Sequence, residues 1–289
     1  VGSEMCIRDS RELLGLQHFA AVSLLEAGQL ALLHVGYNQE AGFFYYVMEA
    51  ADDAGGGAID PLTYIPNTLS EALRRRGRIP AAQTLAIAAA LAEALAGLHA
   101  RGLVHRDIKP SNIIFVAGTA KLADIGTVGS ITADHNVTGT PGYVPLEGAG
   151  TPAADVFSLG KVMYEILMGA DRGQFPRLPD GFENWPDRVL LLELNEIIAK
   201  ACDPYPSRRH PDGSSLLDEI RGLQGGQSVR QQRRRARNML LGTLGVGSAL
   251  ILAGIVLLPA ALRERRRRPR EVYQGALGRA ALALELGDP

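Results

Sequence analysis

The spacing of apolar residues predicts alternating helical and extended stretches along most of the chain. Apolar residues recur at helical intervals over residues 11–26, and two β-favouring runs follow at 30–37 and 43–48. The longest helical pattern covers residues 80–101, where Ala and Leu predominate and Gly102 supplies a stop signal. Further helices are expected from Thr68 or Ser70 to Gly77 and at 151–168, 190–202 and 216–223, with short strands at 113–116 and 121–123.

An uncharged apolar run occupies residues 239–262. It is long enough to cross a bilayer, so it predicts one transmembrane helix; a buried core helix is the alternative. Arginines flank both ends, at 230–237 and 263–270, so the positive-inside rule gives no orientation. Small residues recur at a spacing of four, which would let two such helices pack and makes a homodimer possible. These small residues are Gly245, Ala249 and Ala253.

Composition adds few constraints. The chain has 289 residues, of which 46% are hydrophobic, and its net charge of −1 gives no general attraction for nucleic acid. Its two cysteines, Cys6 and Cys202, supply neither a disulfide framework nor metal-ligand spacing, so a reducing compartment is expected.

The first ten residues, VGSEMCIRDS, carry no apolar period and no signal-peptide pattern. They resemble the translated end of a sequencing adaptor, so residues 1–10 are not expected to belong to the fold; the alternative is a natural, disordered N-terminus. On the adaptor interpretation Cys6 is not native, and the chain begins inside a domain.

Residues 105–112, HRDIKPSN, hold the densest chemistry in the chain. An acid, a lysine and an amide stand at fixed offsets between two apolar runs. A polar loop after a helix would explain such residues without chemistry, but the whole string resembles the H-R-D-L-x-x-x-N catalytic loop of protein kinases. The resemblance implies that Asp107 accepts the proton of an attacking hydroxyl, that Lys109 steadies the transferring phosphate, and that Asn112 holds a metal ion.

Other stretches resemble kinase motifs in the expected order. Residues 124–126, Asp-Ile-Gly, stand where D-F-G is usual, with Ile125 in the place of phenylalanine, and imply that Asp124 is a metal ligand. In the segment 139–147, Thr140 is expected to bond Asp107. Two further contacts are implied: Asp155 with the backbone of the catalytic loop, and Glu147 with Arg209 or, as the second choice, Arg208.

The resemblance also assigns a nucleotide site and a regulatory arginine. Glu12, in the helix expected at 11–26, would pair with a small-lobe lysine, with a solvated glutamate as the alternative. Thr132 and Thr138 are candidates for phosphorylation, and Arg106 would read the added charge. At the adenine site Met48 would be the gatekeeper, the backbone of Glu49 and Ala51 would bond the base, and Ile114 would form its floor.

The chain thus resembles a bacterial, eukaryotic-like (Hanks-type) Ser/Thr protein kinase. The resemblance covers residues 11–223 and implies an α+β, two-lobe protein-kinase-like fold with a mostly helical large lobe, ATP and Mg²⁺ as cofactors, and a protein substrate. A basic linker at 224–238 would lead to one membrane helix at 239–262 in the inner membrane. The ATP-using kinase domain would be cytoplasmic, and 263–289 would begin a C-terminal region.

Two kinase parts do not occur in the sequence. No G-x-G-x-x-G string lies near the start, and no lysine precedes Lys109. The small lobe is therefore expected to be incomplete, ATP binding weak and activity low. The alternative is a membrane-anchored pseudokinase that serves as a scaffold or binding module; a receptor with an outer domain after Arg270 is a further option.

Overall fold

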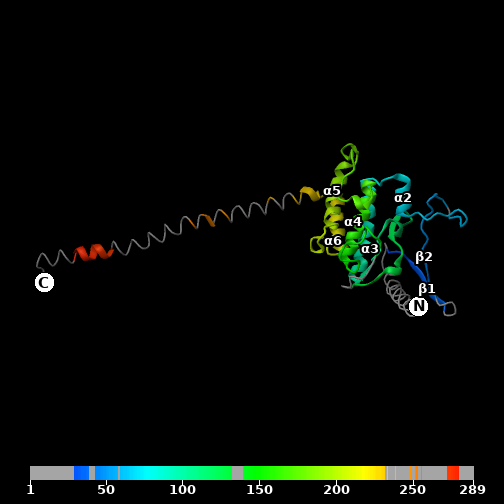
Figure 1. Cartoon of the computed structure of the whole chain (residues 1–289), viewed down its shortest axis with the longest axis horizontal. Helices are drawn as coiled ribbons and strands as arrows, with labels where there is room; N and C mark the ends of the chain where they lie inside the picture. Colours follow the sequence, from blue (N-terminus) through cyan, green and yellow to red (C-terminus); the bar gives the residue numbers. More distant parts are fainter. Residues whose placement is uncertain are drawn as a thin grey trace. The chain divides into compact units, whose positions relative to one another are not determined.

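The computed structural model describes residues 29–38, 43–57, 59–131, 139–231 and 272–279, together with 233, 238, 248, 251, 252 and 255. The chain divides into two compact units, residues 1–230 and 231–289, and each is described by itself (Figure 1). The helix expected at 11–26, including Glu12, lies outside the described residues. Thr132 and Thr138 lie outside them too.

The small lobe is described as one antiparallel hairpin. Strands β1 (Leu32–Asn38) and β2 (Phe43–Met48) pair with Val35 opposite Tyr46, close to the two predicted runs. Gly36 leaves room for a cross-strand aromatic, since a Cβ there would lie 2.4 Å from the ring of Tyr45. The hairpin therefore depends on a glycine at position 36, which makes room for Tyr45, as well as on β-favouring residues.

Helix α2 (Leu69–Arg76) begins and ends where its sequence signals predict. The Thr68 side chain accepts a hydrogen bond from the backbone N–H of Glu71 at 3.0 Å, which decides between the two candidate caps. Gly77 ends the helix with a φ of 71°, a conformation that glycine adopts at little cost.

The core of the large lobe forms around α3 (Ala81–Ala100), which packs against α4 (Pro152–Met168) and α6 (Gly213–Gln224); α5 (Arg188–Ala201) covers α4 (Figure 1). A Cβ on Gly213 would lie 2.5 Å from the backbone nitrogen of Ala96, so α6 approaches α3 as closely as its first residue allows. The four helices match the predicted ranges within a few residues.

Among the described residues, α3 is the one helix long and apolar enough to cross a membrane. Half of that stretch is buried, and Leu91, Leu95 and Leu98 are fully enclosed. This burial is typical of a core helix. The run at 239–262, for which the membrane helix is predicted, lies outside the described residues except for four positions.

Two short two-stranded antiparallel sheets carry the site in the large lobe. Strand β3 (Leu103–Val104) pairs with β6 (Gly129–Ser130), and β4 (Ile113–Val116) pairs with β5 (Thr119–Leu122). Asp52, just after the small lobe, accepts bonds at 2.8 and 2.9 Å from the N–H groups of Ala117 and Gly118 in the β4–β5 turn. One carboxylate thus joins the segment between the lobes to the large lobe.

The start of the predicted linker is fixed to the domain. Val229 is buried, and Glu193 of α5 accepts bonds from the Ser228 hydroxyl at 2.8 Å and from the Arg230 N–H at 3.1 Å. The chain therefore stays attached to the kinase-like domain through Arg230, beyond the boundary at residue 224 that the composition suggests.

A polar clamp in the large lobe is formed by Arg78, Trp185 and Asp187. Arg78 Nη2 donates to both carboxylate oxygens of Asp187, at 2.7 and 2.5 Å, and its guanidinium lies 4.0 Å over the ring of Trp185. Asp187 also accepts the backbone N–H of Ala81 at 2.8 Å, at the start of α3. Because the clamp is mostly buried, each partner depends on the other.

We expect Asp187→Ala to lower the free energy of unfolding by about 2 kcal/mol, because it leaves the Arg78 guanidinium and the N-terminus of α3 without their acceptor. Urea unfolding would measure this loss. Asp180→Ala is the matched control: it removes an ion pair with Arg177 in which both side chains are mostly exposed, and it should change stability by less than about 0.5 kcal/mol. Equal losses in the two variants would contradict the clamp.

Candidate active site

One buried carboxylate, that of Asp155, fixes the backbone at the start of the loop 105–112. Asp155 of α4 accepts the backbone N–H of His105 at 2.7 Å and that of Arg106 at 2.9 Å, and it also contacts His99 at 3.2 Å. Arg106 has a φ of 74°, which is costly for a residue with a side chain. The two hydrogen bonds to Asp155 stabilise this turn, as expected from the sequence.

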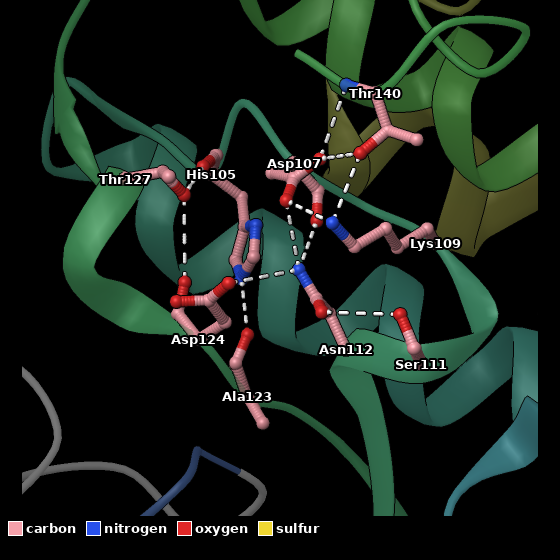
Figure 2. A network of polar contacts seen from close by, with 9 residues as sticks. All are labelled: His105, Asp107, Lys109, Ser111, Asn112, Ala123, Asp124, Thr127 and Thr140. Atoms are coloured by element: carbon pink, nitrogen blue, oxygen red, sulfur yellow. Dashed lines mark hydrogen bonds and ion pairs between the residues drawn. The ribbon is translucent and has the colours of Figure 1, made fainter.

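Asp107 lies at the centre of a polar network (Figure 2). Its Oδ1 accepts the Thr140 hydroxyl at 2.6 Å and the Thr140 N–H at 3.2 Å. Its Oδ2 accepts Lys109 Nζ at 2.7 Å and Asn112 Nδ2 at 3.0 Å. Partial burial works to raise the pKa of Asp107, but the bonds from Lys109 and Thr140 outweigh it and hold the pKa below the ordinary value. The carboxylate is therefore ionised at neutral pH.

Asn112 and Asp124 face each other beside this carboxylate. Asn112 Nδ2 donates to the Asp107 carbonyl at 2.9 Å and lies 3.3 Å from an Asp124 oxygen, as Figure 2 shows. The side-chain oxygen of Asn112 has one distant contact, with Ser111 at 3.4 Å. An amide oxygen and a carboxylate suit Mg²⁺, which often takes only one or two protein carboxylates and completes its shell with phosphate oxygens and water. The described residues include no cluster of three or more His, Cys, Asp or Glu that could hold a metal alone.

Ile125 fits the position where kinases usually carry phenylalanine. It is fully buried, while Asp124 before it adopts a left-handed backbone and stays exposed. His105 Nε2 lies 3.1 Å from the Ala123 carbonyl, which can only accept, so this nitrogen carries the proton (Figure 2). Burial lowers the pKa of His105, so the ring is neutral.

The expected adenine site lies where β2 meets the large lobe. Met48 ends β2, and Ile114 is buried in β4. The Glu49 carboxylate accepts the Ala31 N–H at 2.7 Å and Lys121 Nζ at 2.6 Å. The Ala51 carbonyl accepts the Tyr64 hydroxyl at 3.0 Å. Sequence reasoning missed Lys121 and Tyr64, because neither stands in a recognisable motif.

The segment 139–147 is fixed to the large lobe at two points. Arg209, almost fully buried, binds Glu147, with Nη2 and Oε2 3.3 Å apart, whereas the Arg208 guanidinium lies over Tyr205. The first choice of arginine is therefore confirmed. The second point was not predicted: Tyr143 donates to Glu165 of α4, and Arg172 lies 4.5 Å over the Tyr143 ring.

Residues 40–179 match the family model described as a protein kinase domain. The chain is 33% identical over 201 residues to a protein named serine/threonine-protein kinases drp72 of Corynebacterium efficiens, covering 63% of this chain and 39% of that protein. It is 27% identical over 249 residues to one named PknA of Corynebacterium glutamicum, covering 76% and 51%. It is also 37% identical over 206 residues to PknK of Mycobacterium tuberculosis, covering 63% and 18%.

The chain thus spans about half or less of the length of these curated relatives. Together with the family model, they support the resemblance to bacterial, Hanks-type protein kinases. Geometry brings five of the predicted site residues together: Asp107, Lys109, Asn112, Asp124 and Thr140. Their chemical roles remain predictions.

Proposed function

We propose that the chain is a membrane-anchored, ATP-dependent serine/threonine protein kinase. The observation that carries the proposal is the ionised carboxylate of Asp107, which lies within hydrogen-bond distance of Lys109, Asn112 and Thr140 at an edge of the lobe. A scaffold would have no need of an acceptor, a cation and two metal-binding oxygens at this spacing.

In the proposed reaction the hydroxyl oxygen of a protein Ser or Thr attacks the γ-phosphorus of ATP. The bond between that phosphorus and the bridging oxygen breaks, ADP leaves, and Asp107 accepts the hydroxyl proton. Lys109 Nζ, 2.7 Å from Asp107 and 3.0 Å from the Thr140 hydroxyl, supplies positive charge beside the transferred group. Thr140 and Asn112 keep the Asp107 carboxylate oriented.

Asn112 and Asp124 would hold Mg²⁺. When bound, the ion neutralises phosphate charge and orients the γ-phosphoryl group. The backbone of Glu49 and Ala51 would bond adenine, beside Met48 and over Ile114. The bond from Tyr64 to Ala51 and the pair of Glu49 with Lys121 would keep this segment rigid.

Arg106 would respond to phosphorylation of Thr132 or Thr138. Its guanidinium already donates to the Ser130 carbonyl at 2.8 Å, at the end of β6 where the segment carrying both threonines begins. A phosphate on either threonine would add a charge-assisted contact to this arginine.

We propose that residues 239–262 cross the inner membrane once, with the kinase domain in the cytoplasm where ATP is available. Three of the four described members of the run support this: Ile251, Leu252 and Ile255 are helical, and each exposes about two thirds of its surface. Apolar side chains exposed on a helix are suited to lipid. The spacing of Gly245, Ala249 and Ala253 makes a homodimer through this helix the accompanying proposal.

The first test is phosphoryl transfer by the full chain with Mg²⁺ and radiolabelled ATP. We expect slow but measurable labelling of Ser or Thr, and Asp107→Asn should lower it at least about 100-fold, because the amide cannot accept the proton. Circular dichroism would verify that the variant is folded. Gln83→Ala is the control, because the Gln83 side chain accepts a hydrogen bond from Arg76 of α2 at 3.0 Å and, among the described residues, none from the catalytic loop. Unchanged labelling in Asp107→Asn, or none in the unsubstituted chain, would favour the scaffold.

The membrane anchor is tested separately by alkaline extraction of cells that express the full chain. The chain should remain in the pelleted membranes, and replacing Leu252 with Arg should release part of it, because a central arginine costs about 2.5–3.5 kcal/mol in insertion. Extraction of the unsubstituted chain into the soluble fraction would contradict the anchor while leaving the kinase proposal intact.

A further inference from the structure

The guanidinium of Arg106 packs against the backbone of Gly129 and occupies the space that a side chain at position 129 would fill. A Cβ built on Gly129 would lie 2.6 Å from Arg106 Nη1, 2.8 Å from Cζ and 2.9 Å from Nη2. These separations are shorter than carbon and nitrogen atoms tolerate. Backbone geometry does not explain the glycine, because Gly129 is absent from the residues with positive φ.

Pairing of β6 with β3 sets this contact. Gly129 lies opposite Val104, two residues before Arg106, and Ser130 lies opposite Leu103. The Arg106 side chain therefore lies along strand β6, covers Gly129 and donates from Nη2 to the Ser130 carbonyl at 2.8 Å. Strand β6 thus gives the guanidinium both a surface, at Gly129, and an acceptor, at Ser130.

The two ends of Arg106 differ in how freely they can move. Its backbone N–H is bonded to Asp155 at 2.9 Å, and its φ of 74° belongs to a tightly held turn. The guanidinium is the flexible end of a long side chain. A methyl group at position 129 would therefore displace the guanidinium and leave the catalytic loop in place.

We propose that Gly129 is a positioning residue for Arg106. Because Gly129 has no side chain, the guanidinium can occupy the position from which it would bind a phosphate on the segment that follows β6. The inference rests on the proposed function, in which Arg106 reads phosphorylation. Recognition of a phosphate by arginine depends on the plane and direction of its N–H groups, so a displaced guanidinium binds it less well.

The first experiment needs no catalysis. In the full chain labelled with ¹⁵N-arginine, the Nε–Hε resonance of Arg106 is identified by its loss in Arg106→Ala. We expect Gly129→Ala to move this resonance. The matched control, Gly222→Ala, replaces a helical glycine of α6 whose nearest neighbour is the side chain of Gln227, and should leave the resonance unchanged. An unmoved resonance in Gly129→Ala would overturn the proposal.

The second experiment measures activation, as the ratio of kcat/KM for the autophosphorylated chain to that for the phosphatase-treated chain. We expect Gly129→Ala to lower this ratio about tenfold while the KM for ATP stays unchanged, and expect no further loss when it is added to Arg106→Ala. Gly222→Ala should keep the full ratio. An undiminished ratio in Gly129→Ala, or an equal loss with and without Arg106, would overturn the positioning role.

The two experiments separate failure of this inference from failure of the proposed function. If the unsubstituted chain transfers no phosphate, the kinase proposal and the positioning role that rests on it both fail, while the resonance still reports the contact between Gly129 and Arg106. If transfer and activation are present, only the substitutions at position 129 decide the inference.

Discussion

The buried carboxylate of Asp155 is the constraint on which the site depends. It gathers the N–H groups of His105 and Arg106, and so holds a left-handed turn that would otherwise be unfavourable. Because the conformation of that turn determines where the next side chain points, it places the Asp107 carboxylate within hydrogen-bond distance of Lys109, Asn112 and Thr140. The buried carboxylate of Asp155 in α4 therefore positions the carboxylate of Asp107 in the catalytic loop.

The partners of Asp107 come from segments far apart in the sequence. Lys109 and Asn112 belong to its own loop, whereas Thr140 enters from the segment that Glu147 and Arg209 fix to the lobe. Each partner donates to the carboxylate, and the bonds from Lys109 and Thr140 outweigh its partial burial, lower its pKa and keep it ionised. Placement and charge, rather than covalent chemistry by the protein, are what the proposed phosphoryl transfer requires.

Local signals predicted most of the fold, because caps, stop signals and apolar periods act within a few residues. Thr68 and Gly77 bound α2, and Gly169 ends α4 where the sequence suggests. Motif order predicted the contacts of Asp155 and Thr140. By contrast, the pair of Glu49 with Lys121 and the fit of Gly129 to Arg106 depend on strand register and packing, which no local pattern encodes.

The most direct test of this account is Asp155→Asn in the full chain, with phosphoryl transfer and thermal unfolding measured on the same sample. An asparagine keeps one acceptor oxygen and replaces the other with an NH2 donor, so one of the two backbone N–H groups loses its acceptor and Asp107 is no longer held in position. The account predicts that transfer falls at least about 100-fold, while cooperative unfolding and the helical circular dichroism persist. Transfer at the unsubstituted rate in a folded Asp155→Asn chain would contradict it.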